Sequence, residues 1–327
     1  MSFRTRLVIL CAVLAGLLAL LALGIFFSPE SVQSRRASQA LLPGLGAQKI
    51  DAVDIAVSGQ PAIGLKKTAG GWETASGGEV YPASAERIAT FLRIVLGLQR
   101  SSLVSSSARH LGDLGLSPDT ARLLVLHQPG TADIGLLVGK RGPGGDADYV
   151  QVRGERAVYL ARGSLAFFLA QEQSYWYELH VLPDDVQGDT IASISVKGSL
   201  RLGSGEALRG GYTLLRPAAD RLDQWVLGGS GKKADRVTAG AMASSVAQLE
   251  GIDFAGPSGS PPTPGMDAGL AISVTTFTGK TYSLSVGRGQ QPGKALITTD
   301  WSPWTYIVSV VPLRRAVLSE PALAAAP

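Results

Sequence analysis

Cysteine is almost absent from this chain of 327 residues, and histidine is scarce. The single cysteine, Cys11, lies inside an apolar N-terminal run, so the rest of the chain has no thiol to form a disulfide or to ligate a metal. Only His110, His127 and His180 remain as nitrogen ligands. The sequence therefore excludes a structural zinc site, and we expect no metal and no other cofactor.

Charge is sparse as well. Charged residues make up 17% of the chain, the formal net charge is +4, and the basic residues are scattered without interleaved aromatics. This pattern gives no support to nucleic-acid binding. Hydrophobic residues at 45% are enough for folded cores, while 40 glycines and 18 prolines favour many short strands joined by turns.

One long uncharged run is present near the N-terminus, at residues 7–27. As a helix it spans a hydrocarbon core of ~30 Å. Arg4 and Arg6 precede it, so the positive-inside tendency leaves the N-terminus in the cytoplasm. We therefore predict a single-pass protein of the inner (cytoplasmic) membrane, with residues 1–27 as cytoplasmic tip and anchor and the C-terminal region outside the cytoplasm.

A cleaved signal peptide is the alternative, because residues 38–40 (Ser-Gln-Ala) suit a signal peptidase. The site lies well beyond the apolar run, which is longer than the usual ~7–15 residues, so an uncleaved anchor is preferred. A seam of small residues within the run, formed by Ala12, Ala15, Ala19 and Ala22, allows close packing of a partner helix. The equally simple interpretation is that alanine is common in bacterial spans.

The rest of the chain can be aligned with itself at an offset of roughly 140–153 residues, which is typical of a duplicated unit. In each copy two strands, a helix, four strands and a short helix are expected. The main helices should follow Ser84 and Thr238, and the short ones should start near Leu165 and Leu313. The aligned strands are 55–57 and 194–196, 71–73 and 224–226, 124–126 and 272–274, 136–139 and 284–287, 149–152 and 296–298, and 158–160 and 306–308.

These elements predict an α+β fold: an N-terminal transmembrane helix, then two tandem repeats of an antiparallel sheet with a helix packed on one face. The expected boundaries are a linker at 28–41, a first unit at 42–181, a second at 182–318 and a flexible tail at 319–327. The Gly- and Pro-rich stretch 256–269 is expected as a mobile loop within the second unit.

Four segments together resemble a bacterial domain-of-unknown-function family, the one numbered four-three-four-zero. They are the initial Leu41–Leu45, the strand Lys67–Glu73, the turn Leu111–Pro118, and Val138-Gly139 leading to Tyr149-Val150. The resemblance covers nearly everything after the anchor, although the second copy lacks the Gly-Leu-x-Pro turn. It implies a membrane-anchored auxiliary protein, often encoded beside ABC-2-type transporter and gliding-motility-type genes, and it implies no catalytic residues.

Segments that resemble enzyme motifs are better explained as turns. Thr278–Thr281 (TGKT) resembles the end of a P-loop, but the first glycine of that motif would fall at Val274 and no helix is expected after it. Gly228–Lys233 is expected as a flexible surface loop. No G-x-S-x-G motif occurs, and none of the three histidines lies beside a credible nucleophile, so we predict that the protein is not an enzyme.

Two acidic clusters are expected to be solvated turn residues instead of a Ca²⁺ or acid–base site. Asp184, Asp185 and Asp189 follow a proline in the connection between the units, and Asp146 and Asp148 lie in a Gly-rich hairpin loop. Aspartate in such turns needs no metal, because its side chain hydrogen-bonds the local backbone.

The aromatic residues are the candidate interface. Tyr175, Trp176 and Tyr177 end the first unit, and Trp301 and Trp304 lie near the end of the second. Such residues anchor protein interfaces and stack on sugar rings. The alternative is that they fill the seam between the units, although consecutive Tyr-Trp-Tyr cannot all face one side.

From the resemblance we expect a non-catalytic extracytoplasmic accessory subunit of an ABC-2-type or gliding-type membrane transport complex. It would act through protein–protein contacts with the integral membrane permease and the other subunits. The alternative is a cell-envelope polysaccharide- or peptidoglycan-binding module that uses the exposed aromatics.

Overall fold

The computed structural model describes residue 16 and residues 40–107, 110–163, 165–202, 207–221, 223–257 and 269–324. The chain divides into two compact units between Glu178 and Leu179. The predicted boundary between Val181 and Leu182 lies a few residues further on. Both units are rich in sheet and poor in helix, so the predicted α+β class is confirmed.

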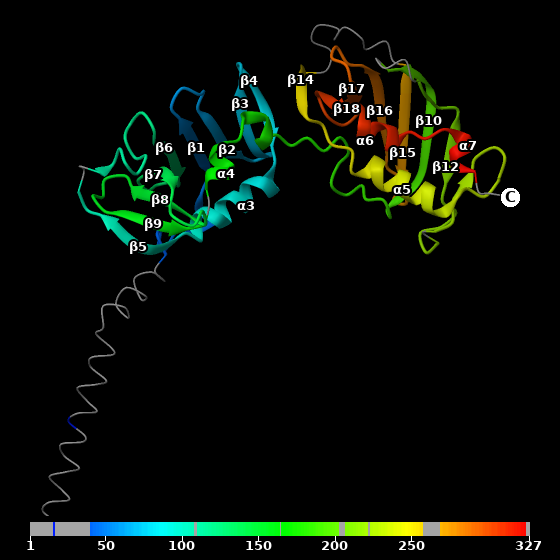
Figure 1. Cartoon of the computed structure of the whole chain (residues 1–327). Coiled ribbons are helices and arrows are strands. Elements are labelled where there is room, and N and C mark those ends of the chain that lie inside the picture. The colour runs from blue at the N-terminus through cyan, green and yellow to red at the C-terminus, as the bar shows by residue number, and fades with distance from the viewer. Residues whose placement is uncertain are drawn as a thin grey trace, which may run out of the picture. The chain divides into compact units, whose positions relative to one another are not determined.

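The first unit is a nine-stranded sheet with few helices (Figure 1). Its elements are η1 (Ala47–Lys49), β1 (Ala52–Val57), β2 (Ile63–Thr68), β3 (Gly71–Ser76), β4 (Glu79–Ala83), α3 (Ala85–Leu96), β5 (Gln99–Ser105), β6 (Arg122–His127), β7 (Ile134–Arg141), β8 (Ala147–Val152), β9 (Val158–Arg162), α4 (Ala166–Leu169) and η3 (Gln173–Trp176).

Helix α3 carries the chain from one edge of this sheet to the other. The strand order is β4-β3-β2-β1-β6-β7-β8-β9-β5, so β4 and β5, which flank α3 in sequence, lie at opposite edges. Ser84 caps the helix at its predicted start, with its side chain accepting from Arg87 N. Its apolar stripe is buried in the same core as the inward residues of the strands, so α3 covers one face. The stripe consists of Ile88, Phe91, Leu92 and Val95.

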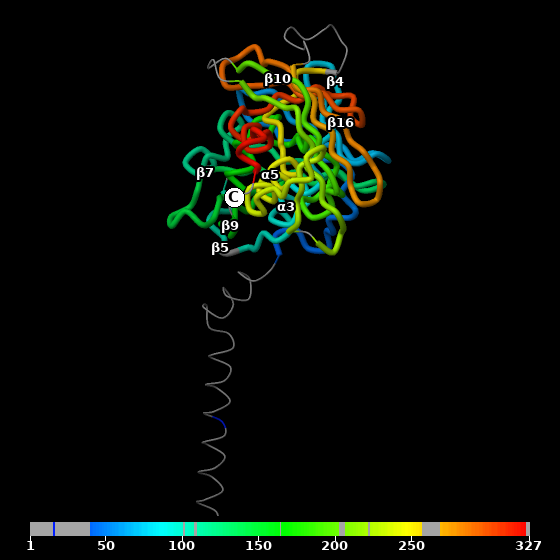
Figure 2. The backbone as a smooth tube through the Cα atoms, turned by 90° about the vertical axis from the view of Figure 1, so that its right-hand side faces the viewer, coloured from blue at the N-terminus to red at the C-terminus, as the bar shows by residue number. Residues whose placement is uncertain are grey.

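The second unit repeats this arrangement. Its elements are β10 (Ile191–Arg201), β11 (Ala207–Arg209), β12 (Tyr212–Leu215), β13 (Val226–Leu227), α5 (Arg236–Ala247), β14 (Asp253–Pro257), β15 (Leu270–Thr276), β16 (Thr281–Arg288), β17 (Lys294–Thr299), β18 (Trp304–Ser309), α6 (Val310–Ala316) and α7 (Glu320–Leu323). The order β13-β12-β10-β15-β16-β17-β18-β14 matches the order β3-β2-β1-β6-β7-β8-β9-β5 of the first sheet. Among the described residues, the edge strand β4 has no counterpart in the second sheet, where the additional strand β11 pairs with β10. Two views show α6 beside α5 (Figure 1, Figure 2).

The ladder registers correct the predicted alignment of the first strands. When Val138 of β7 is aligned with Val286 of β16, the ladders align Leu124 with Ile272, as predicted. The same registers align Ile55 with Val196, and not with Ile194. Periodicity determines which side chains of a strand point to the core, but it cannot detect an alignment error of two residues. Such an error leaves every side chain on the same face of the sheet.

The predicted number of strands is too small. Each unit has further strands at its sheet edges, including β4, β5 and β14, which the alternating pattern did not reveal. Edge strands bury few side chains, so their sequences are not forced to alternate. The second main helix also begins earlier than predicted, because Asp235 caps it by accepting from Thr238 N at 2.8 Å.

In the part of the chain that the structure describes, no helix is long and apolar enough to cross a membrane. The predicted anchor 7–27, its alanine seam, the linker as far as residue 39 and most of the Gly- and Pro-rich stretch lie outside the described residues.

Candidate binding surfaces

The sheet edges are built in ways that discourage strand addition. β5 has register shifts at two places against β9, and β14 has one against β18. β4 contains Pro82, whose carbonyl accepts from Glu178 N, and its last residue pairs with Tyr177. β13 is only two residues long. Bulges, proline and short length all blunt an edge, so the sheet faces are the better candidates for contact with other molecules.

The face of the first sheet that points away from α3 holds a concavity of about 640 Å³. Alternation places Val53 and Ile55 in the core and turns Ala52, Asp54 and Ala56 outward. Gly64 lies opposite Asp54 on β2 and gives the surface its depth. The charged side chains that line the concavity are Asp51, Asp54, Lys66, Glu73 and His127.

His127 is held between two carboxylates. Its Nε2 lies 2.9 Å from Asp54 Oδ2, and its Nδ1 lies 2.9 Å from Asp133 Oδ1. Partial burial lowers the pKa of His127, but the hydrogen bonds and charges of Asp54 and Asp133 together outweigh it, so the pKa is raised above its usual value. Only the doubly protonated ring can donate to both carboxylates, so this arrangement favours the imidazolium.

Beside this charged group the same face carries aliphatic side chains. Leu123 and Val125 on β6 and Leu137 on β7 point outward and are partly exposed. A partly exposed aliphatic patch bordered by charges is the composition expected of a protein-contact surface.

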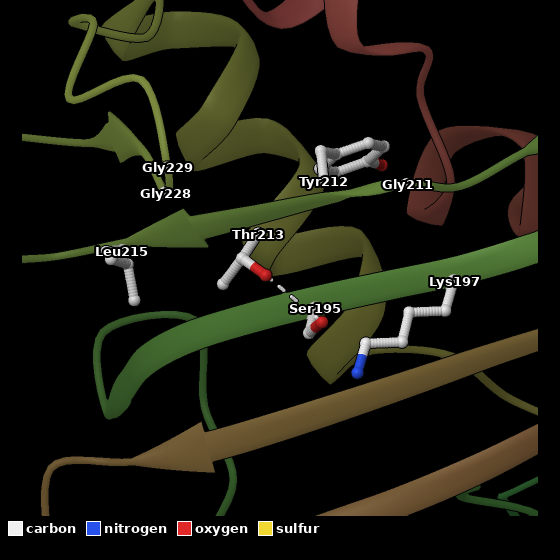
Figure 3. A pocket seen from close by; sticks show the side chains of 8 residues that line it. All are labelled: Ser195, Lys197, Gly211, Tyr212, Thr213, Leu215, Gly228 and Gly229. Carbon is white, nitrogen blue, oxygen red and sulfur yellow. Dashed lines mark hydrogen bonds between the residues drawn. The ribbon is translucent and has the colours of Figure 1, made fainter.

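The second unit has a concavity of about 540 Å³ over the equivalent strands. Figure 3 shows Ser195 and Lys197 of β10 and Thr213 of β12 there, with the Thr213 hydroxyl donating to Ser195 Oγ at 3.1 Å. Tyr212 points the other way and is buried, with its hydroxyl 3.8 Å from Met242 Sδ of α5. The two concavities thus lie at the same place in the fold and are lined by different chemistry.

The aromatic candidates of the first unit are mainly core residues. Trp176 is fully buried and packs edge-on against Phe91 of α3, with ring centroids 5.3 Å apart. Tyr177 is 5% exposed and lies 4.9 Å from the ring of Tyr81. Tyr175 is the partly exposed member, so one of the three consecutive aromatics is partly exposed, as predicted.

The aromatic candidates of the second unit are more accessible. Trp301 is 41% exposed, and its Nε1 donates to the carbonyl of Val181 at 3.0 Å, which fixes the ring. Trp304 is partly buried against Phe254, at a centroid distance of 5.6 Å. Trp301 is therefore the large aromatic of the candidate set that a ligand reaches most easily.

One acidic prediction is wrong. Asp148 is 1% exposed and lies within β8, where its Oδ2 accepts from Leu165 N at 2.8 Å ahead of α4. The glycines before Asp148 predicted the hairpin turn correctly, but they did not show where the turn ends. Strand β8 begins at Ala147, so Asp148 lies in the strand and not in the turn. Asp185 is exposed, as predicted, and accepts from Lys280 Nζ at 3.3 Å.

The motif-like segments are turns. Thr278–Thr281 connects β15 to β16, and Gly279 has a φ of 84°, which favours glycine. Gly228–Lys233 is an ordered turn, not a free loop, because Gly228 N donates to Thr213 O and Gly231 N to Leu227 O. Among the described residues no group of three or more His, Cys, Asp or Glu side chains is arranged to hold a metal ion.

Fold and surfaces together define a sheet-rich α+β protein of two like units, each with an open sheet face opposite its helix layer. The chain belongs to the family described as Domain of unknown function (DUF4340), which matches residues 72–270. The match begins in β3 and ends in β15, so it includes parts of both units, whereas the initial segment Leu41–Leu45 lies outside it. No curated protein and no solved structure matches the chain.

Proposed function

We propose that this chain is a non-catalytic, extracytoplasmic accessory subunit of an ABC-2-type or gliding-type membrane transport complex. The predicted anchor at 7–27 would hold it in the inner membrane beside a permease, and the folded units would contact the other subunits. The observation that carries the proposal is the open face of the first unit, where the aliphatic residues of β6 and β7 adjoin the Asp54–His127–Asp133 group.

This face has the properties that a protein partner requires. The side chains of Asp54, His127 and Asp133 are fixed by hydrogen bonds before any partner arrives, so they lose little side-chain entropy on binding. Charges of both signs at a rim favour one partner and one orientation over others. The aliphatic side chains beside them supply area that gains from removal from water.

The experiment is co-purification from detergent-solubilised membranes with the tagged full-length chain. A permease and an ATPase should be recovered with the native chain. Lys66→Glu reverses an exposed charge beside the Asp54–His127 pair, and we expect it to reduce recovery about fivefold or more, because like charges then meet across the rim.

Lys232→Glu is the matched control, since Lys232 is an exposed lysine of the second unit, outside both concavities. It should leave recovery unchanged. Absence of any permease with the native chain, or equal recovery with Lys66→Glu, would contradict the proposal.

A polysaccharide-binding module is the second candidate, favoured by the exposed Trp301. Trp176→Ala does not test it, because loss of a fully buried tryptophan costs about 3–5 kcal/mol of stability and confuses unfolding with loss of binding. Trp301→Ala removes a partly exposed ring and leaves the core intact, so lost glycan retention would be specific.

We also propose that the two units arose by duplication. The matching strand order and the equivalent position of α3 and α5 support this origin. The proposal predicts that isolated residues 40–178 and 179–327 each fold, which their far-UV circular dichroism and cooperative melting would test.

A further inference from the structure

The outward face of the second sheet is covered by hydroxyl groups. Alternation buries Ile194, Val196, Ile272 and Val274 and turns the residues between them outward. All the outward hydroxyl residues are at least partly exposed. They are Ser193 and Ser195 of β10, Thr213 of β12, Ser273 and Thr275 of β15, Thr281, Ser283 and Ser285 of β16, and Thr298 of β17.

These hydroxyls form rows across the strands. Thr213, Ser195, Ser273 and Ser283 lie directly opposite one another on four neighbouring strands. Thr275 and Thr281 form part of a second row, with their hydroxyl oxygens 3.0 Å apart. Neighbouring strands lie about 4.8 Å apart, so the face presents a regular grid of groups that both donate and accept hydrogen bonds.

The first unit shows that the fold does not require this grid. With Val138 aligned to Val286, the row Thr213–Ser195–Ser273–Ser283 corresponds to Gly64–Asp54–Val125–Gly135. Thr275 likewise corresponds to His127. In the first sheet His127 pairs with Ala52, and in the second sheet Thr275 pairs with Ser193, which is equivalent to Ala52. The same backbone positions thus carry glycine, charge and aliphatic groups in one unit and hydroxyls throughout in the other.

The composition of the face selects among partner classes. Serine is depleted at protein interfaces, where aromatics, methionine and arginine are enriched. Nucleic acid requires a basic stripe, but the strands β10, β12 and β15 carry only two cationic residues. They are Lys197 and Arg201, the last residue of β10. A lipid surface requires a contiguous exposed apolar patch, whereas, of the described residues that line the concavity, Leu215 is the one large apolar side chain that is exposed.

The strands β10, β12, β15, β16 and β17 contain no Asp or Glu. An acidic side chain meets the rows at their edge, where Asp300 Oδ1 accepts from Ser283 N at 3.0 Å. The ligand that suits an uncharged grid of donors and acceptors is itself uncharged and rich in hydroxyl groups. Such a ligand replaces the hydrogen bonds of the displaced water, so few polar groups remain unpaired.

We infer that the outward face of β10, β12, β15 and β16 binds a neutral polysaccharide chain, and that the concavity of about 540 Å³ lined by Ser195, Lys197 and Thr213 is part of this site. This inference deepens the second candidate function and moves the contact from the aromatics to the hydroxyl rows. It is independent of the protein contacts proposed for the first unit.

The test is isothermal titration of the full-length chain in detergent with a soluble neutral β-glucan and a soluble neutral α-glucan, with polygalacturonate as anionic comparison. The native chain should bind a neutral glucan. Thr213→Val with Ser273→Val should weaken binding about fivefold to 150-fold, because each of the two lost hydrogen bonds contributes about 0.5–1.5 kcal/mol. Valine is tolerated in this register, since Val125 stands at the position equivalent to Ser273.

Val125→Ser is the matched control in the first unit and should leave glucan binding unchanged. Melting curves of all variants verify folding, and permease recovery with the double variant should equal that of the native chain. No binding of either neutral glucan, a preference for polygalacturonate, or undiminished binding by the double variant would overturn the inference. Loss of binding in Trp301→Ala alone would assign the site to the aromatic instead.

Discussion

At the scale of single residues, His127 links the first unit to pH. Its pKa is raised by Asp54 and Asp133 in the folded protein, and unfolding removes both partners. A raised folded pKa means that the stabilisation is complete below the unfolded pKa of about 6.5 and is lost as pH rises through the folded pKa.

We therefore predict that His127→Asn lowers the melting temperature more at pH 5.5 than at pH 8.5. Asparagine keeps a polar side chain but carries no charge for the two carboxylates. His110→Asn is the control, because His110 is an exposed histidine that lies 3.5 Å from a single exposed carboxylate, Asp113. A difference between native and variant melting temperatures that is the same at both pH values would contradict this account.

Arg216 is a second residue whose role only the structure reveals. It is 7% exposed and its guanidinium lies 4.2 Å from the ring centroid of Trp225. It donates to the carbonyls of Gly188, Asp189 and Ile191 at 2.9–3.2 Å. Burial lowers the pKa of Arg216 and the charge of Asp189 raises it, with burial the larger effect.

Arg216→Met should destabilise the second unit by about 2–3 kcal/mol, because the carbonyls of Gly188, Asp189 and Ile191 lose their donor and the hydrogen bond to Ile191 is buried. Arg209→Met replaces an exposed arginine of β11 and should have little effect. Urea denaturation followed by tryptophan fluorescence measures both. Equal midpoints for the two variants would show that the buried guanidinium contributes nothing.

At the scale of elements, Gly139 lets the connection between β5 and β6 lie against β7. A Cβ at this position would overlap the carbonyl oxygen of Leu114 and crowd Leu116. The Leu114 carbonyl also accepts from Lys140 N at 2.9 Å, which fixes the connection to the strand. Leu116 is buried as a result, at 2% exposure.

Gly139→Ala should therefore displace this connection and cost about 1–3 kcal/mol, within the range found for overpacked sites. Limited proteolysis near residues 110–121 should become faster than in the native chain. Gly130→Ala would not serve as control, because its φ is 73° and alanine is strained there. Gly46→Ala is suitable, since no other atom lies within 4 Å of the place that the added methyl group would occupy. Unchanged proteolysis in Gly139→Ala would contradict the packing argument.

Elements also show where sequence patterns end. The central strands β1, β6, β7, β15 and β16 bury one face, so their sequences alternate, and their ends were predicted within three residues. The edge strands β4 and β5 include exposed hydrophobic residues such as Val80 and Leu103 and lack that constraint. Their positions follow from pairing with β3 and β9, which no local pattern records.

At the scale of the whole molecule, the units share a strand order and differ in surface chemistry. Inward positions such as Leu124 and Ile272 remain apolar in both, because both sheets must bury a helix. The outward positions are free of that constraint and have diverged. Two units with similar strand orders can therefore present two surfaces with separate partners, and variants on one face should leave the binding of the other unchanged.

The anchor prediction also belongs to this scale. Deletion of residues 1–39 should leave the folded units intact and transfer the protein from the membrane fraction to the soluble fraction, because the uncharged run 7–27 is then missing. Mass spectrometry of the native protein distinguishes anchor from signal peptide. A mature N-terminus at residue 41 would support cleavage after Ala40 and contradict the anchor.

The sequence by itself determined the α+β class, the repeated order of central strands, the cap at Ser84 and the family, because each of these depends on local periodicity or on short motifs. Tertiary structure alone decided the edge strands, the burial of Trp176 and Asp148, the clamp on His127 and the hydroxyl grid. These features join residues far apart in the chain, and only the register of paired strands brings them together.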